Sequence, residues 1–395
     1  MSFLKKSFRS ILSAMAILFV FFSVTYTSIC LLWYFKLLIQ DRFMQRTIKS
    51  GFVRHPFLTG DHIPNQQILE KMPDGSTYHW ALNAQGCRDD VDYIETKKPD
   101  VTRWMCLGGS VLACGSKNEV TIPAFLQKNL NQNFPSKLEV YNFGRVGWDS
   151  TQVLIAFATE FRKYRPDYLL LYSGRNDAFQ ASMPVYRPFW NSWSFETDRE
   201  LNQRSYSKEL FYPLWRASEK IRTLRSPTSY AKNNAHQLFQ EKNKGIFDFY
   251  RAHHEIGPIY RDNLLNIIAL AQNMGCKGVY LVLQPQLEWC NKNKTQEEMD
   301  FEERRLQPSW SKAMKELYPV IKEAHAQVAQ SSVLPLLEID LNPWIAQSSS
   351  RMFMDDCHLT DSGNEAVSHK IAPEMQRLME KTRQPLNSSK NSKSK

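Results

Sequence analysis

The segment Cys106-Leu-Gly-Gly-Ser110 carries a hydroxyl group directly after an apolar run that starts at Trp104. An apolar run that stops at glycines is typical of a buried strand ending in a tight turn. In an open α/β sheet, ligands bind at the carboxyl ends of the strands. A serine hydroxyl attacks an acyl carbon only with a base, a group that orients the base, and donors for the oxyanion. Ser110 is therefore a candidate nucleophile, and its partners must come from elsewhere in the chain.

Three further segments place polar side chains or glycines where such partners are needed. They are Asn142-x-Gly144-x-x-Gly147, Gly174-x-Asn176-Asp177 and Asp355-x-x-His358. Each alone is a weak signal, because glycines often only let the backbone pass and Asn-Asp after a strand is most often a helix cap. A lone Asp-x-x-His is most often a solvated loop. Their joint order on an alternating α/β pattern makes the set specific.

The elements that must position these segments alternate along the chain. Strands are predicted over 103–107, 138–143, 168–172, 279–283 and 336–341, and helices over 122–131, 149–164, 262–274, 308–330 and 363–379. Strands separated by helices imply a parallel sheet covered on both faces. We expect an α/β domain over 76–381, preceded by a linker and irregular lead-in over 36–75 and followed by a disordered basic tail over 382–395.

Residues 180–250 interrupt this alternation and are rich in aromatic residues and prolines. The pattern favours an inserted helical subdomain with its own small core, which can also serve as a cap over the active site. Trp190 and Trp193 in this stretch are candidate substrate contacts. Arg175, beside Asn176, is a third candidate for an anionic or sugar substrate, although a surface or structural salt bridge is the favoured alternative.

With these motifs the chain resembles the SGNH hydrolases, also called the GDSL lipase/esterase family, over about residues 76–380 with the 180–250 insertion outside. The segment 83–88, Asn-Ala-Gln-Gly-Cys-Arg, also resembles the lead-in of membrane-anchored bacterial members. The resemblance implies a flavodoxin-like three-layer α/β/α fold with a five-stranded parallel sheet. It also implies an enzyme that needs no organic cofactor.

The resemblance implies a role for each site residue. It makes Ser110 the nucleophile, His358 the base and Asp355 the partner of the base. Chemically, the imidazole would take the hydroxyl proton and return it to the leaving group, while the carboxylate fixes the tautomer. The backbone N–H groups of Ser110 and Gly147 and the side-chain amide of Asn176 would form the oxyanion hole.

Rival hydrolase chemistries lack their motifs. The Gly-x-Ser-x-Gly elbow of α/β-hydrolases is absent because Leu112 takes the place of the last glycine. The run His253-His254-Glu255 lacks the second half of a His-Glu-x-x-His zinc site. A metal on Asp355, Asp356 and His358 is disfavoured because no histidine cluster supports it, so we expect none. The family's usual Gly-Asp-Ser is Gly-Gly-Ser here, a departure that its members tolerate.

Residues 11–35 contain no charged side chain. Their length of 25 residues exceeds the roughly 20 that cross a bilayer. Lys5, Lys6 and Arg9 precede the stretch, as expected for a start that stays in the cytoplasm. We expect a cytoplasmic stub and an uncleaved signal anchor over 1–35, with a cleaved signal peptide as the alternative. The remaining chain would lie outside the cytoplasm, which is the periplasm in a bacterial cell.

The formal charge of +10 is concentrated at the chain ends. Residues 1–49 carry a net +6 and residues 376–395 a net +5, so the rest is near neutral at −1. A near-neutral domain has no electrostatic footprint for nucleic acid, so no nucleic-acid partner is expected. The seven cysteines contain no C-x-x-C motif and are expected to be small buried residues. Pairing of Cys276 with Cys290, or of Cys106 with Cys114, is conceivable outside the cytoplasm.

Two classes of function fit these observations. The first is a serine-dependent hydrolase of acyl esters, acting outside the cytoplasm on O-acylated carbohydrate or lipid. Its variant is an O-acyl(acetyl)transferase to a polysaccharide, and the motifs do not separate the two because water and a sugar hydroxyl attack the same acyl-enzyme. The second class is a non-catalytic scaffold that binds glycan or a membrane partner, against which the complete set of site residues argues.

Overall fold

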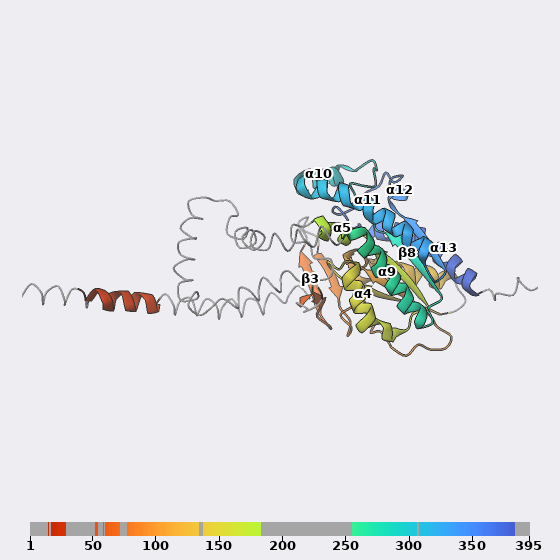
Figure 1. The fold of residues 1–395 in the computed structure, drawn as a ribbon, viewed down its shortest axis with the longest axis horizontal. Helices are drawn as coiled ribbons and strands as arrows, with labels where there is room; N and C mark the ends of the chain where they lie inside the picture. The colour runs from red at the N-terminus through yellow and green to blue at the C-terminus, as the bar shows by residue number, and fades with distance from the viewer. Residues whose placement is uncertain are drawn as a thin grey trace, which may run out of the picture. The chain divides into compact units, whose positions relative to one another are not determined.

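The computed structural model describes residues 15, 17–28, 52–53, 58, 60–71, 77–133, 137–182, 255–305 and 308–383 (Figure 1). The chain divides into two units, one formed by Met1–Ser50 and Thr197–Glu241 and the other by Gly51–Glu196 and Lys242–Lys395. The described candidate site residues all belong to the second unit. Trp190, Trp193, most of the expected insertion and residues 384–395 lie outside the described residues.

Within the described residues, a five-stranded parallel sheet forms the centre of the second unit. In spatial order, its strands are β6 (Leu138–Gly144), β5 (Thr102–Gly108), β7 (Tyr168–Ser173), β8 (Gly278–Leu283) and β9 (Leu336–Asp340). Numbered along the chain, this order is 2-1-3-4-5, which is the flavodoxin-like doubly wound arrangement. The predicted parallel α/β sheet is therefore confirmed.

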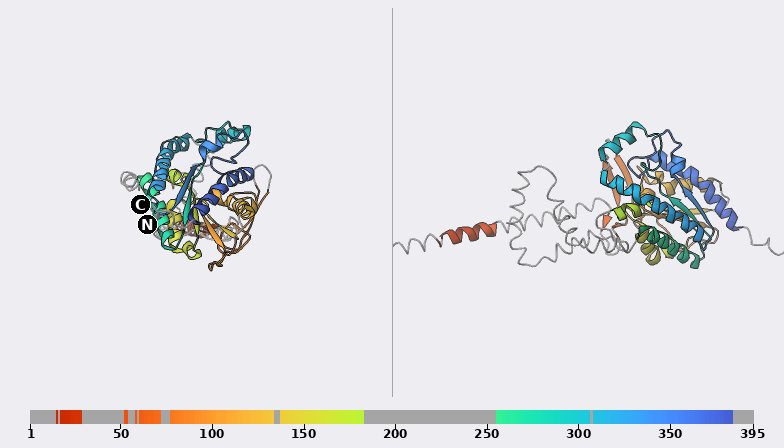
Figure 2. Two further views of the ribbon diagram at one scale, coloured as in Figure 1. Left: turned by 90° about the vertical axis from the view of Figure 1, so that its right-hand side faces the viewer. Right: turned by 45° about the horizontal axis from the view of Figure 1, so that its top comes forward.

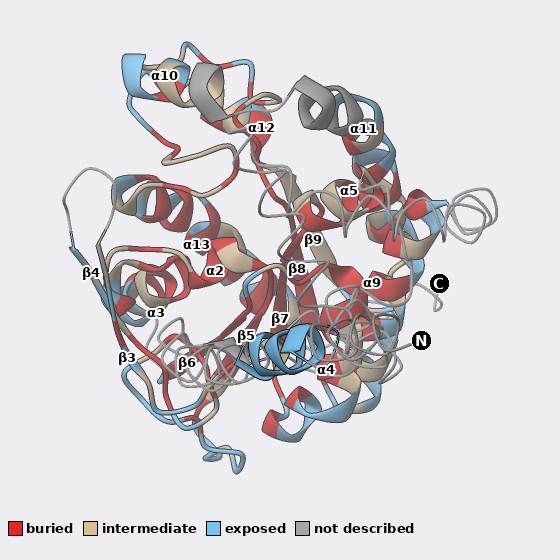
Figure 3. Ribbon diagram, turned by 90° about the vertical axis from the view of Figure 1, so that its left-hand side faces the viewer, coloured by how far each residue is buried: buried red, intermediate tan, exposed pale blue. Residues whose placement is uncertain are grey.

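Helices cover both faces of this sheet (Figure 3). The first face carries α4 (Ser150–Thr159), α5 (Arg175–Ser182), α9 (Ile256–Asn273) and α11 (Pro308–Ser331), and the second carries α2 (Ser110–Ala113), α3 (Ile122–Asn133) and α13 (Asp361–Arg383). Helices α9 and α11 lie side by side (Figure 2). The short helix α12 (Asn342–Ile345) follows β9.

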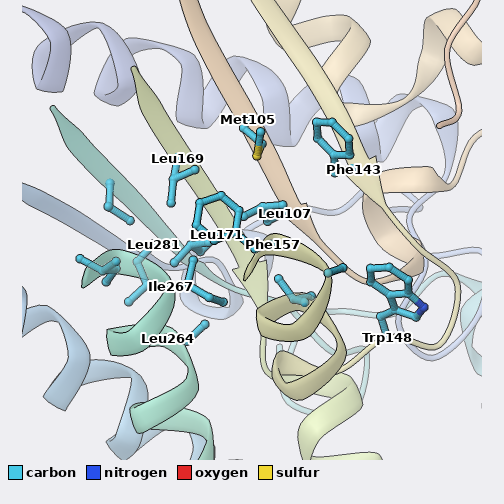
Figure 4. Close-up of a cluster of buried hydrophobic side chains, with 14 of the residues drawn as sticks. Met105, Leu107, Phe143, Trp148, Phe157, Leu169, Leu171, Leu264, Ile267 and Leu281 are labelled. Carbon is cyan, nitrogen blue, oxygen red and sulfur yellow. The ribbon is translucent and has the colours of Figure 1, made fainter. Parts of the chain in front are cut away.

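Successive strand residues face opposite helix layers, as the pleat of a strand requires. In β7, Leu169 and Leu171 belong to the hydrophobic cluster under α4 and α9, which Figure 4 shows in part. Leu170 and Tyr172 belong to the cluster under α3 and α13. Every residue of β7 is buried, which explains why its sequence reads as a continuous apolar run rather than an alternating one.

The lead-in contains more regular structure than its sequence predicted. Strands β1 (Phe52–Val53) and β2 (Asp61–His62) pair with each other, and β3 (Gln67–Lys71) pairs with β4 (Thr77–Ala81). The hairpin of β3 and β4 brings Ile68 and Ala81 into buried positions. Part of the segment expected to be a linker is therefore folded against the α/β domain, because it supplies its own apolar residues.

The described cysteines agree with the expectation of small buried residues. Six of them are free, and of these only Cys114 is partly accessible. The conceivable pairs Cys276 with Cys290 and Cys106 with Cys114 are therefore not formed. Burial raises the pKa of the Cys106 thiol and keeps it neutral.

Residues 17–28 are helical, and they fall inside the uncharged stretch 11–35. Among the described residues, no helix combines the length and the apolar composition that a membrane crossing requires. Residues 11–14 and 29–35 of the predicted anchor lie outside the described residues.

Candidate active site

Ser110 lies at the carboxyl edge of the sheet, where it begins α2 directly after β5. In the strand register, Gly108 pairs with Gly144 of β6 and with Tyr172 of β7. A Cβ atom on Gly108 would lie 2.1 Å from the carbonyl oxygen of Tyr172, so only glycine fits between these strands. The three segments that follow β5, β6 and β7 therefore start at one level of the sheet.

The three predicted triad residues meet at this edge. The Oγ of Ser110 lies 2.6 Å from Nε2 of His358, and Nδ1 of the same ring lies 2.6 Å from Oδ2 of Asp355. An ionised carboxylate only accepts hydrogen bonds, so Nδ1 carries the proton and donates it. Nε2 is then free to accept from the serine hydroxyl. This is the tautomer that a general base needs.

Asp355 also shapes the loop that carries the histidine. Its Oδ1 accepts the backbone N–H groups of Cys357 at 2.9 Å and of His358 at 2.6 Å. An antiparallel bridge between Phe353 and Leu359 closes the loop behind it. One carboxylate thus fixes both the turn and the ring, which is why a spacing of three residues suffices.

The charges of the pair reinforce each other. Burial raises the pKa of Asp355, but His358 and the backbone donors outweigh it and hold this pKa at about 2. Burial lowers the pKa of His358, whereas Cys357 and Asp355 raise it well above the ordinary imidazole value. Because burial also raises the pKa of Cys357 itself, that thiol is neutral at pH 7. The Asp355 carboxylate is therefore the charge that stabilises the imidazolium.

The amide of Asn176 lies beside the nucleophile. Its Nδ2 donates to the backbone oxygen of Trp148 at 2.7 Å, and a Cβ atom on Gly109 would lie 2.6 Å from the same nitrogen. The nitrogen carries a second N–H, which can donate to a substrate oxygen. Any side chain at position 109 would require the Asn176 amide to shift. Glycine leaves room for the observed position of this amide next to Ser110.

Gly147 lies in the loop between β6 and α4. Its φ of 75° is in the left-handed region, where glycine is favoured. A Cβ atom added there would meet nothing within 4 Å, so the backbone conformation, and not a shortage of space, explains the glycine. The neighbouring Trp148 carbonyl accepts from Asn176, which ties this loop to the end of β7.

Residues of the folded lead-in hold the loop between β6 and α4 through two hydrogen bonds. The buried Arg145 donates from Nε to Oδ1 of Asp61 at 2.8 Å, and the indole N–H of Trp148 donates to the backbone oxygen of Gly60 at 2.7 Å. These contacts could not be predicted from the sequence, because they join residues more than eighty positions apart.

Arg175 forms the salt bridge that was its favoured alternative. Its Nη2 lies 2.7 Å from Oδ2 of Asp356, and its guanidinium lies over the ring of Phe179, 4.4 Å from the centroid. Its Nη1 donates to Oδ1 of Asn176 at 3.3 Å. The candidate substrate contact is thus engaged by protein groups on both sides of the site.

A pair of buried carboxyl groups links the loops after β6 and β7. Asp149 caps α4, accepting the backbone N–H groups of Thr151 and Gln152. Asp177, expected only to cap its own helix, instead accepts the backbone N–H of Ser150 at 3.0 Å from the neighbouring loop. Burial, and then the charge of Asp177, raise the pKa of Asp149. The loop that contains Gly147 and the start of α5, which contains Asn176, are therefore both anchored to the start of α4.

Glu298 holds the segment that precedes the histidine loop. It comes from α10 (Gln296–Arg305), and its Oε1 accepts the backbone N–H groups of Met352 at 3.0 Å and Phe353 at 3.1 Å. Its Oε2 accepts from Nζ of Lys292 at 2.6 Å, and both side chains are fully buried. The sequence reading missed this residue, because Gln296–Arg305 is mostly charged and shows no apolar stripe.

Donor atoms of Asp355, Cys357 and His358 lie within 4.8 Å of one another, a spacing that could hold a metal ion. Both nitrogens of the imidazole, however, already face Asp355 and Ser110. The contacts of this ring therefore describe a proton-transfer chain.

No family model and no curated protein matches the sequence. Among solved structures, the chain is similar to LAE5, an alpha/beta hydrolase from the metagenome of Lake Arreo, Spain, with 13% identity, a TM-score of 0.40 and coverage of 70% of this chain and 96% of that one. It is also similar to a lipase/acylhydrolase from Enterococcus faecalis, with 16% identity, a TM-score of 0.38 and coverage of 70% of this chain and 96% of that one. A third similar structure is a mutant of Axe2, an acetyl-xylooligosaccharide esterase from Geobacillus, with 12% identity, a TM-score of 0.38 and coverage of 71% of this chain and 96% of that one. Similarities with such low identities and TM-scores assign no activity to this chain. The chemistry is therefore argued from the geometry of its own residues.

Proposed function

We propose that the protein is a serine-dependent acyl-ester hydrolase in which Ser110, His358 and Asp355 form the catalytic triad. The observation that carries this proposal is the pair of 2.6 Å contacts that joins the hydroxyl, the imidazole and the carboxylate. A hydroxyl within hydrogen-bond reach of a base whose second nitrogen is oriented by a carboxylate is the signature of an activated nucleophile.

The reaction follows from these contacts. The Oγ of Ser110 attacks the acyl carbon while its proton passes to Nε2 of His358, and the carbonyl electron pair moves to oxygen. The oxyanion accepts from the side-chain amide of Asn176 and the backbone N–H groups of Ser110 and Gly147. Its collapse breaks the ester bond, and the imidazolium returns the proton to the departing alcohol. Water then attacks the acyl-enzyme with His358 again as base, the acyl–Oγ bond breaks, and the imidazolium returns the proton to Ser110 as the carboxylic acid leaves.

We further propose that the chain is anchored in a membrane through residues 11–35 and acts outside the cytoplasm on O-acylated carbohydrate or lipid. The uncharged stretch after Lys5, Lys6 and Arg9 supports the anchor. The resemblance of segment 83–88 to anchored bacterial members supports the substrate class. A sugar hydroxyl can replace water in the second step, so transfer to a polysaccharide is the variant of the same proposal.

Release of acetate from O-acetylated glycans tests the proposal. The wild-type chain should release acetate, and adding an acceptor sugar should divert acyl groups to that sugar if the protein is a transferase. Ser110→Ala should lower turnover by several orders of magnitude, because the nucleophile is lost. A Ser110→Ala protein that keeps full turnover would refute the assignment.

A further inference from the structure

Arg175 connects the two halves of the candidate site. It is the first residue of α5, directly after β7 and Gly174, and so belongs to the oxyanion side. Its salt-bridge partner Asp356 lies on the loop of the base, between Asp355 and Cys357. The side chains of Arg175 and Asp356 are 14% and 27% exposed, so the bridge is largely shielded from solvent.

On the oxyanion side, Arg175 and the Trp148 carbonyl together set which end of the Asn176 amide faces the nucleophile. Its Nη1 donates to Oδ1 of Asn176, and the backbone oxygen of Trp148 accepts from Nδ2. The two contacts require opposite ends of the amide, so a flipped amide would lose both of them. Only the observed orientation places N–H, and not oxygen, beside Gly109, where an oxyanion would need a donor.

On the base side, Arg175 holds the turn that carries His358. The side chain of Asp356 accepts from Arg175, and its backbone oxygen accepts the N–H of Leu287 at 3.0 Å. The residues on either side of Asp356 are the carboxylate partner of the imidazole and a backbone donor to that carboxylate. A shift of Asp356 would therefore move the hydrogen-bonded turn of Asp355 as a unit.

The surroundings of the guanidinium favour a fixed side chain. The planar group lies over the ring of Phe179 and divides its donors between an amide oxygen and a carboxylate. A lysine ammonium cannot reproduce this fork, because it is a point charge on a flexible stem.

We propose that Arg175 is a positioning residue that sets the oxyanion amide of Asn176 and the loop of His358 relative to each other, rather than an anchor for an anionic substrate. This inference rests on the proposed esterase function. It predicts that loss of Arg175 affects the chemical step more than substrate binding, for neutral and anionic esters alike.

Steady-state kinetics of Arg175→Met, Arg175→Lys, Asp356→Asn and the double variant Arg175→Met/Asp356→Asn test the proposal, with a neutral acetyl ester and a carboxylate-bearing one. We expect Arg175→Met to lower kcat at least about tenfold with KM changed less than about twofold. Arg175→Lys should recover only part of the loss, and the double variant should be little worse than Arg175→Met. The control is Arg377→Met, which removes an exposed arginine paired with Glu374 on α13 and should change nothing.

The outcomes are distinguishable. A rise in KM confined to the anionic ester, or an unchanged kcat in Arg175→Met, overturns the positioning role while leaving the esterase function intact. A wild-type chain that neither turns over esters nor reacts with a fluorophosphonate refutes the esterase function, and the inference with it. If Arg175→Met fails to fold, as seen by denaturant unfolding, Arg175→Lys and Asp356→Asn decide the question by the same split between kcat and KM.

Discussion

At the scale of single residues, Asp355 orients both the imidazole of His358 and the turn that carries it. It accepts from the imidazole and from two backbone N–H groups, and its pKa of about 2 keeps it ionised at neutral pH. Its charge and its hydrogen bond also help to raise the pKa of His358. Only the neutral imidazole can act as a base, so the proposed esterase activity should rise with pH through a value above the ordinary histidine pKa.

Replacing Asp355 with Asn should therefore change the pH dependence in a defined direction. Without the carboxylate the imidazolium is less stable, so the pKa of His358 falls and the acidic limb of kcat/KM moves to lower pH. The maximal rate should fall by on the order of 10⁴, because the amide no longer fixes the tautomer. A pH–rate profile checks both effects, with Asp262→Asn, which changes an exposed carboxylate, as the control. An acidic limb that stays in place would contradict the pairing.

Gly109 gives a second prediction at this scale. A methyl group at this position would press on the Asn176 amide, which Trp148 and Arg175 hold in place. Gly109→Ala should lower kcat by roughly 10- to 100-fold, because displacing one oxyanion donor costs a large part of its contribution. The φ of Gly109 is −84°, so alanine introduces no backbone strain and the unfolding midpoint should hardly change. Wild-type kcat in this variant would place the oxyanion elsewhere.

At the scale of elements, the sequence predicted the parts with a strong apolar pattern. It predicted all five strands of the sheet from their apolar residues. It also predicted the helices that the structure shows as α3, α4, α9, α11 and α13. It missed α10 because Glu298 contributes through a buried ion pair, which leaves no periodic apolar signal. It also left β1, β2 and β3 inside a supposed linker, because short strands are too brief to show a period.

The buried pair in α10 predicts a large stability effect. Glu298→Ala leaves Lys292 without its buried partner and leaves two backbone N–H groups without their acceptor, which should cost about 3–5 kcal/mol. Urea unfolding measures the loss. Glu302→Ala in the same helix is the matched control, because its bridge to Lys294 is partly exposed and should be worth about 1 kcal/mol or less. Equal losses of unfolding free energy in the two variants would show that the buried ion pair of Glu298 contributes no more than an exposed one.

At the scale of the whole molecule, one sheet edge collects residues from the two halves of the sequence. Ser110 and His358 are 248 positions apart, yet the 2-1-3-4-5 order brings their loops together at the carboxyl ends of the strands. Strand order was accessible from the sequence only through the family resemblance, because periodicity reveals elements and not their neighbours. The links through Arg175 and Asp177 were beyond reach for the same reason, since each joins loops of different strands.

The proposed anchor makes a prediction for the whole chain. The full-length protein should stay with the membrane fraction after alkaline carbonate washing, because residues 11–35 are long enough to span the bilayer. Replacing Phe21 and Phe22 with Arg should release the chain or prevent its insertion, since each central charge opposes insertion by about 2.5–3.5 kcal/mol. Recovery of the wild-type chain in the wash would remove the basis for the anchor.

The most direct test of the central claim is covalent trapping of the nucleophile. A fluorophosphonate reacts with a serine whose hydroxyl has been activated by a base, and peptide mass spectrometry then identifies the labelled residue. We expect a single adduct on Ser110 in the wild-type chain and a much slower reaction in His358→Ala. An adduct on another serine, or labelling of His358→Ala at the wild-type rate, would contradict the proposed triad.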